Sequence, residues 1–151
     1  MGEEFSEIVS SEENVARIIF SPSFIFGGRV SPTAFRWEIL PSGTVEDYIS
    51  VLRGNTSKLD AATRFFKARN KGDSRYGYAL LNVSDIRNIK ILPNNNVSVD
   101  VKSYPSKTFP FHAGIIADID GKRVTAVTDI TPEIMMLQKR LAMICSEIVK
   151  F

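Results

Sequence analysis

His112 is the only histidine of the chain, and it lies in the stretch with the strongest local signal. Two strand-like apolar runs flank Asp120-Gly121, a pair preferred in two-residue hairpin loops because both loop positions take positive φ. This turn predicts that Asp118 lies opposite Arg123. The same register, extended along the hairpin, places Asp129 opposite His112. A carboxylate beside an imidazole holds one tautomer and raises its pKa, which suits a general base.

One hypothesis is therefore a small hydrolase, or a ribonuclease- or transferase-type enzyme. His112 would be its acid/base, Asp129 the partner of the imidazole, and Arg36 or Arg53 the group that neutralises a phosphate. The candidate nucleophiles are serines and threonines, and no G-x-S-x-G motif selects one of them. A lone histidine in a strand is more often a structural residue, so the sequence leaves open whether the protein is an enzyme.

The basic, aromatic middle of the chain carries the other functional signal. Residues 57–71 have helical spacing, with Ser57 as the N-cap and with apolar and basic residues on opposite faces. Bases interleaved with aromatic residues suit phosphate contact and base stacking. The basic residues of this predicted surface are Arg64, Lys67, Lys71 and Arg75.

Our leading hypothesis is a small binding domain that contacts nucleic acid or an acidic protein through helix 57–71. The structural alternative is a helix whose basic face is simply solvated. The run matches no RNP, KH or zinc-finger pattern, so the partner is inferred from charge and aromatic content only.

The composition is that of an ordinary globular protein. Of 151 residues, 44% are hydrophobic and 24% are charged, and the formal net charge is +2. This length suits a single α+β domain over residues 1–151. Residues 1–10 form an acidic stretch that we expect to be a flexible tail, although such a stretch also has the charge to lie against the basic middle.

Several functional classes are excluded by residue content. No apolar stretch approaches the roughly 20 residues that a membrane-spanning helix needs, and the acidic N-terminus is unlike a secretory signal. A single cysteine, Cys145, forms no intramolecular disulfide, which indicates a cytoplasmic setting. One histidine and one cysteine exclude a zinc site of such ligands, and the fragment at residues 118–121 lacks key positions of a calcium loop. No metal or cofactor is expected.

The elements that position these residues follow from apolar spacing and from capping residues. Ser10 or Ser11 as a cap, with Glu13 near position N3, predicts a helix over residues 11–20. Strand-like alternation predicts a hairpin formed by residues 34–40 and 47–53 across a Pro-Ser-Gly turn. Further strands are predicted at residues 79–83, 89–92 and 97–101, with a helical turn at Ser84–Arg87.

The C-terminal region carries a strong helix signal. Thr131 is the predicted N-cap, Pro132 fills the first helical position, and apolar residues recur at threes and fours as far as Ile148. Cys145 falls beside this apolar stripe, where a buried and unreactive thiol is expected. Three methionines of this helix are expected to pack rather than to form a binding surface: Met135, Met136 and Met143.

These elements together predict an α+β fold. A mostly antiparallel, strongly curved sheet of about seven strands would pack against a middle helix and a long C-terminal helix. The strand order does not follow from the sequence. Homodimer formation, through the C-terminal helix or a sheet edge, is a third interpretation beside the binding and enzyme hypotheses.

Overall fold

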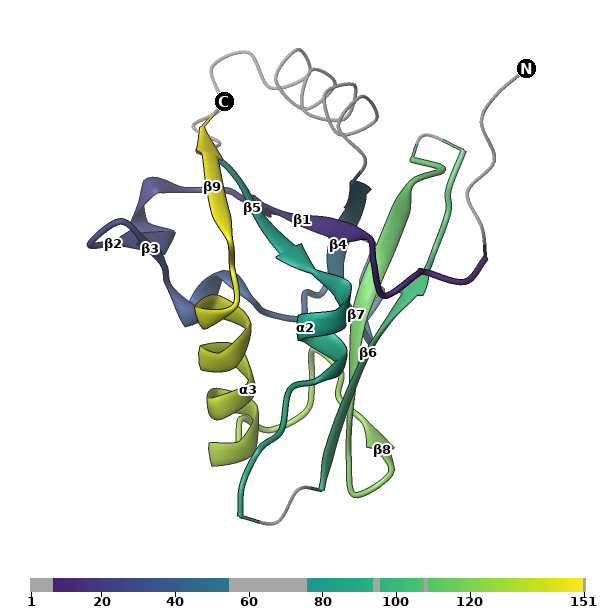
Figure 1. Ribbon diagram of the computed structural model, residues 1–151. Coiled ribbons are helices and arrows are strands. Elements are labelled where there is room, and N and C mark those ends of the chain that lie inside the picture. The colour runs from purple at the N-terminus through teal and green to yellow at the C-terminus, as the bar shows by residue number, and fades with distance from the viewer. Residues whose placement is uncertain (1–6, 55–75, 94–95, 108, 151) are drawn as a thin grey trace.

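The computed structural model describes residues 7–54, 76–93, 96–107 and 109–150. Within these residues the main sheet has seven strands in the order β6–β7–β4–β1–β5–β9, with β8 paired to β7 (Figure 1). Its strands are β1 (Asn14–Ile19), β4 (Ile49–Gly54), β5 (Gly77–Asn82), β6 (Val97–Ser103), β7 (His112–Ile119), β8 (Lys122–Arg123) and β9 (Glu147–Lys150). All the paired strands are antiparallel.

The remaining elements are short. A separate ribbon consists of β2 (Ile25–Phe26) and β3 (Arg29–Val30), and the helices of the described residues are η1 (Pro22–Phe24), η2 (Pro32–Ala34), α2 (Val83–Arg87) and α3 (Pro132–Met143). In Figure 1, α3, β9 and the β2–β3 ribbon gather at one end of the sheet, whereas β6, β7 and β8 form the other end.

The two faces of the sheet are buried unequally. Successive residues of a strand point to opposite faces, so Val15 joins the large core while Ala16 joins a small cluster on the other face. The large core receives the buried side chains of α3, which are Ile134, Leu137 and Leu141. The small cluster lies on the second face of the central strands, and His112 and Ser50 lie beside it.

The fold class is confirmed as mixed α and β with a mostly antiparallel seven-stranded sheet. The sheet is open and not strongly curved, because β6 and β9 stand at separate edges. The C-terminal helix is shorter than predicted, since α3 ends at Met143 and residues 147–150 form β9. The predicted middle helix at residues 57–71 lies outside the described residues.

The Asp-Gly hairpin is confirmed. Asp118 pairs with Arg123 and Ile119 with Lys122, and the loop residues Asp120 and Gly121 have φ values of 52° and 78°. Both values lie in the region that a tight two-residue loop requires. An ion pair of 3.0 Å between Arg123 Nε and Asp118 Oδ1 joins the two strands.

The predicted helix over residues 11–20 is wrong, because residues 14–19 form β1. The capping residues make a turn instead: Ser10 N donates to Glu13 Oε2 at 2.7 Å, and Glu13 N donates to Ser10 O at 3.1 Å. After this turn the apolar run pairs with β5 over its full length. Pairing with a distant strand therefore determines the conformation of residues 14–19, although the local capping residues favour a helix.

The predicted hairpin of residues 34–40 with 47–53 is also wrong. The first segment begins in η2 and forms only an isolated bridge between Ile39 and Val45, while β4 pairs with β1 and β7. Residues 89–92 form no strand, although Ile89 and Ile91 are buried. The strands predicted at 79–83 and 97–101 and the turn at Ser84–Arg87 correspond to β5, β6 and α2.

Two expectations about exposure also change. Part of the predicted flexible tail is anchored, because Val9 is buried and its backbone oxygen accepts a hydrogen bond of 2.6 Å from Arg87 Nη2. The methionines that were expected to pack are exposed instead, namely Met135, Met136 and Met143. They lie on the side of α3 that faces away from its buried leucines.

Candidate functional site

His112 lies at the start of β7, between β4 and β6. Its partner on β4 is Leu52, and on the β6 side its backbone oxygen accepts a hydrogen bond of 2.9 Å from Tyr104 N. β4 and the end of β6 therefore pair with His112 on its two sides, which leaves no place for the segment that follows β8. The predicted pairing of His112 with Asp129 is wrong.

The hairpin register fails because the chain leaves β7 soon after the turn. Val124 N still donates to Ala117 O at 2.9 Å, in register, but Ala126 N donates to Glu46 O at 3.0 Å. A turn at residues 125–128 then changes the direction of the chain. In this turn the backbone N–H of residue 125 donates a hydrogen bond of 2.9 Å to Thr128 Oγ1. Residues beyond this turn no longer follow β7.

The imidazole of His112 makes two hydrogen bonds that fix its tautomer. Nδ1 lies 3.0 Å from the backbone oxygen of Tyr104, and Nε2 lies 2.5 Å from Ser50 Oγ. A carbonyl oxygen only accepts, so Nδ1 carries the proton and donates it. The Nε2 lone pair then accepts the hydroxyl proton of Ser50. This arrangement is that of a serine nucleophile with its general base.

Tyr48 packs against the imidazole and is itself stacked on Tyr104. The Tyr48 ring meets His112 edge-on, with ring centroids 5.7 Å apart, and stacks on Tyr104 at 4.7 Å. Gly114 permits this position, since a Cβ at Gly114 would lie 2.7 Å from Tyr48 Cβ. The close packing holds the ring in place and removes water from part of its surface.

Burial lowers the pKa of His112 below its usual value of 6.5, and the hydrogen bond to the Tyr104 carbonyl opposes this shift in part. The direction is opposite to the one predicted from a partnering Asp129. A lowered pKa keeps the imidazole neutral at pH 7, so that Nε2 is free to accept a proton.

Arg17 fills a split between two central strands. The β1–β4 register ends at the pair Ala16 and Leu52, whereas β1 continues along β5 and β4 continues along β7. In this split, Arg17 Nη1 donates to Ser50 O at 2.8 Å, and Nε donates to Ala34 O at 2.9 Å. The guanidinium thereby replaces the ladder hydrogen bond that Ser50 lacks on the β1 side.

The charge of Arg17 is almost enclosed by protein. The residue is only 3% exposed, and burial lowers its pKa to about 10, so it remains a cation at neutral pH. Among the described residues, no hydrogen bond engages its Nη2 group. Arg17 therefore keeps donor capacity beside Ser50 for an anionic group of a substrate.

Glu46 and Tyr48 form a second polar pair near the imidazole. Glu46 is 8% exposed, and burial raises its pKa although a hydrogen bond with Tyr48 opposes the shift. Burial, together with the nearby Glu46, raises the pKa of Tyr48 to about 12. The phenol thus stays protonated and donates to the carboxylate, which orients the ring against His112.

Apart from the two tyrosines, these groups border a cleft of about 230 Å³. Its walls combine apolar and aromatic side chains with a few polar groups, as is typical of ligand sites. The lining residues are Arg17, Ile18, Phe20, Glu38, Leu40, Glu46, Ser50, Val51, Leu52, Phe109 and His112. The cleft thus exposes the Ser50–His112 pair next to a cation.

The two arginines predicted to bind phosphate are engaged elsewhere. Arg53 is 3% exposed, and its Nε and Nη2 meet the Glu13 carboxylate at 2.9 and 2.7 Å. Arg36 forms an ion pair of 3.4 Å with Glu38 and lies over the Phe24 ring. Neither borders the cleft, whereas Arg17 does.

Sequence reasoning missed Arg17, Ser50 and Glu46. A charged residue inside the apolar run of residues 14–19 was a usable signal, because an arginine there has to be buried with partners. Ser50 had no such signal, since its contact with His112 depends on the pairing of β4 with β7.

The basic surface predicted from the sequence lies outside the described residues; it consists of Arg64, Lys67, Lys71 and Arg75. Over residues 7–54, 76–93, 96–107 and 109–150, no cluster of His, Cys, Asp and Glu has a metal-binding arrangement. No helix in this part of the chain is long and apolar enough to span a membrane.

Comparison with known proteins gives no family assignment. No family model matches the chain, and no curated protein or solved structure matches it significantly. The chemistry of the cleft is therefore the basis for a functional proposal.

Proposed function

We propose that the protein is a small hydrolase or group-transfer enzyme with Ser50 as its nucleophile and His112 as its general base. The observation that carries this proposal is the 2.5 Å contact between Ser50 Oγ and His112 Nε2. The tautomer required for that role is supported by the bond from Nδ1 to the Tyr104 carbonyl. The proposal keeps the enzyme hypothesis drawn from the sequence, but Arg17 replaces Arg36 or Arg53 as the cation that neutralises negative charge.

The reaction begins when Ser50 Oγ attacks an acyl carbon or a phosphorus atom. As the bond to Oγ forms, the hydroxyl proton moves to His112 Nε2. The imidazolium then gives this proton to the leaving group as the bond to that group breaks. Water or a second substrate repeats the sequence on the covalent intermediate and releases the serine.

Arg17 acts on the charge that develops during this displacement. An oxygen of the reacting acyl or phosphoryl group becomes more negative, and a cation already fixed beside it stabilises that state without reorganising. Arg17 is held by two backbone carbonyls, so it is fixed before the substrate binds. The cleft also contains Glu38 and Glu46, which disfavours a highly anionic substrate.

The structural alternative is that Ser50 and His112 only hold β4 and β7 together. Against this reading, the two strands are already joined by their backbone ladder, and both side chains line an open cleft. The contact-surface hypothesis for residues 57–71 stays a prediction, because those residues lie outside the described part of the chain.

The proposal is tested with diisopropyl fluorophosphate, which reacts with activated serines without a specificity pocket. Ser50 Oγ would bond to phosphorus as fluoride leaves and the serine proton is taken up by His112. We expect a single adduct at Ser50 by peptide mass spectrometry, and no adduct in Ser50→Ala. His112→Asn should slow labelling by about 100-fold or more, the usual range for a lost general base.

The matched control is Ser98→Ala, which removes an exposed serine of β6 and should label at the wild-type rate. Thermal melting of each variant separates lost reactivity from lost folding. An adduct that forms on another serine, or labelling of Ser50 that is equally fast in His112→Asn, contradicts the proposed roles.

A further inference from the structure

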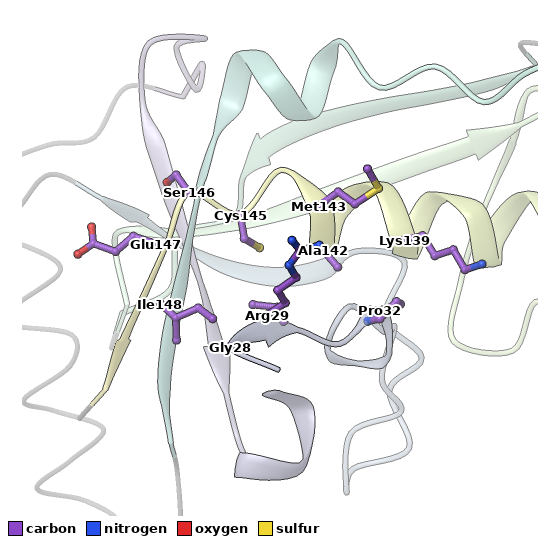
Figure 2. A pocket seen from close by; sticks show the side chains of 11 residues that line it. Gly28, Arg29, Pro32, Lys139, Ala142, Met143, Cys145, Ser146, Glu147 and Ile148 are labelled. Carbon is purple, nitrogen blue, oxygen red and sulfur yellow. The ribbon is translucent and has the colours of Figure 1, made fainter. Parts of the chain in front are cut away.

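A second cavity, of about 770 Å³, lies at the other end of the sheet. It is enclosed by the β2–β3 ribbon, the C-terminal end of α3 and the edge strand β9 (Figure 2). None of its lining residues belongs to the Ser50–His112 cleft. Its volume is within the range of small-molecule sites, which is about 300–1,000 Å³.

The floor of the cavity is apolar. Val30 is buried beneath it, and Ala142, Cys145 and Ile148 are partly buried side chains packed against the main core. Met143 adds an exposed thioether side chain at the rim. Such a floor favours an apolar ligand body, because the ligand and the floor both leave water on binding.

Two cations stand at the rim of this apolar floor, Arg29 from β3 and Lys139 from α3. In the described part of the chain, no hydrogen bond or ion pair engages either side chain. Figure 2 shows Arg29 extending from β3 toward Ala142 and Cys145, across the cavity. Glu147 is the acidic residue of the lining, and its side chain points away from Arg29.

The turn between β2 and β3 places Arg29 at the rim of the cavity. Gly27 and Gly28 have φ values of 59° and 77°, which glycine adopts at no steric cost. The ribbon closes with Ile25 opposite Val30 and Phe26 opposite Arg29. Because Val30 is buried while its neighbour Arg29 is exposed, the short strand places an apolar and a cationic group side by side.

We propose that this cavity binds a small amphiphilic anion, that is, an apolar body that carries a carboxylate or a phosphate. The apolar body lies on Ala142, Cys145 and Ile148, and the anionic group meets Arg29, with Lys139 at the other side of the rim. Neither cation has a hydrogen-bond or ion-pair partner among the described residues, so binding engages them without breaking an ion pair in that part of the chain. The site is separate from the proposed catalytic cleft and does not depend on it.

Binding at this site is non-covalent. Burial raises the pKa of the Cys145 thiol to about 12, and Sγ donates to Leu141 O at 3.4 Å. The thiol is therefore protonated and unreactive at neutral pH, as the sequence predicted. Cys145 contributes to the apolar floor and not to chemistry.

Methionine methyl groups offer a site-specific readout. In protein labelled with ¹³C at the methionine methyls, decanoate or decyl phosphate should shift the resonance of Met143, which lines the cavity, in a saturable way. Met135 and Met136 lie on the same helix outside the cavity and should not move. A positive result with only one of the two anions also supports the proposal and identifies the headgroup.

Three further probes test which part of the ligand matters. Decanol has the apolar body without the charge, inorganic phosphate has the charge without the body, and decyltrimethylammonium reverses the charge. Each should bind at least about tenfold more weakly than the best amphiphilic anion. Equal binding of any of these three probes would overturn the proposal.

The decisive variant is Arg29→Glu, which should weaken binding about tenfold or more because it reverses the charge at the rim. Arg36→Glu is the matched control, since Arg36 does not line the cavity, and it should bind as the wild type does. A second variant, Ala142→Trp, fills the floor and should abolish the Met143 shift while Met135 and Met136 keep their resonances. Unchanged affinity in Arg29→Glu, or no shift of Met143 with either anion, would contradict the proposal.

Discussion

The two cavities of this protein differ in how they hold their cations. The cleft at His112 lies among the central strands, and its Arg17 is almost fully buried with both contacts to backbone carbonyls. The cavity beside β9 lies at a sheet edge, and its Arg29 is exposed. A buried, fixed cation suits stabilisation of a transient charge, whereas an exposed cation beside an apolar floor suits reversible binding.

This difference also separates the energetic roles of the two sites. Residues of the cleft help to hold the sheet together, because the Arg17 side chain bridges β1 and β4 where their backbones separate. Residues of the edge cavity are added onto a core that is already complete beneath them. Substitutions in the cleft should therefore change stability, whereas substitutions of the exposed, charged side chains of the edge cavity should change affinity with little effect on stability.

The largest effect on stability is expected for Gly114→Val. A Cβ at this position would meet Tyr48 Cβ at 2.7 Å, and the added methyls deepen the clash, so the free energy of unfolding should fall by about 3 kcal/mol or more. Urea denaturation measures the loss. The comparison variant Gly28→Ala meets nothing within 4 Å but has φ +77°, and it should lose only about 1 kcal/mol. Equal losses for both variants would show that Tyr48 does not pack tightly there.

Next in size is Arg17→Met. This change leaves the buried oxygens of Ser50 and Ala34 without their donor, and the free energy of unfolding should fall by about 2 kcal/mol. Arg29→Met, at the exposed rim of the other cavity, should stay within about 0.5 kcal/mol of the wild type. A stability of Arg17→Met as high as that of Arg29→Met would mean that Arg17 does not hold the split together.

The contrast between confirmed and failed predictions has a physical basis. The Asp120-Gly121 loop was predictable because two φ values, set by two adjacent residues, determine it. The N-cap of α3 was predictable for the same local reason: Thr131 Oγ1 accepts the backbone hydrogen bond of Ile134 at 3.3 Å.

The main failures in assigning elements depend on long-range pairing. Helical spacing continues past Met143, but residues 147–150 alternate and pair with β5, which ends the helix early. The cleft depends on the point at which β1 leaves β4, and this point has no sequence signature. The histidine was visible in the sequence, while its partner Ser50 became visible only with the sheet order.

The pH dependence of stability separates the cleft from the rest of the molecule. The pKa of His112 is lowered by burial, so below pH 6.5 the unfolded chain takes up a proton that the folded protein resists. The contribution of His112 to stability should therefore fall as the pH is lowered through this window. The fall should be smaller than the loss in Arg17→Met. Urea denaturation at pH 7.5 and pH 5.5 measures it.

The control for this experiment is His112→Asn, in which the loss between these two pH values should be smaller. Burial raises the pKa of Glu46, so its contribution to stability rises as the pH falls, but Glu46 is present in both proteins and its effect cancels in the comparison. Glu13 does not interfere in this range. Burial raises its pKa, but its bonds to Arg53 and Ser10 outweigh this and hold the pKa below 4.5. Its contribution is therefore lost only in more acidic solution. A pH dependence that persists unchanged in His112→Asn would assign the effect to another group.

The smallest effect is expected at the rim of the edge cavity. Among the described residues of that lining the acidic group is Glu147. Glu147→Gln removes it, and the affinity for decanoate should rise about two- to threefold, because exposed charges interact weakly across water. Titration of the Met143 methyl resonance measures the change, and the stability should not alter. A weaker affinity in Glu147→Gln would show that this carboxylate helps to form the site.

The tautomer of His112 tests the catalytic proposal most directly, because the roles of Ser50 and His112 depend on it. Ring ¹⁵N NMR of the wild-type protein against pH reports which nitrogen carries the proton and at which pH the second proton binds. We predict a proton on Nδ1, an unprotonated Nε2 at neutral pH, and a pKa below 6.5. A proton on Nε2, or a pKa above 6.5, would contradict a Ser50–His112 nucleophile and base.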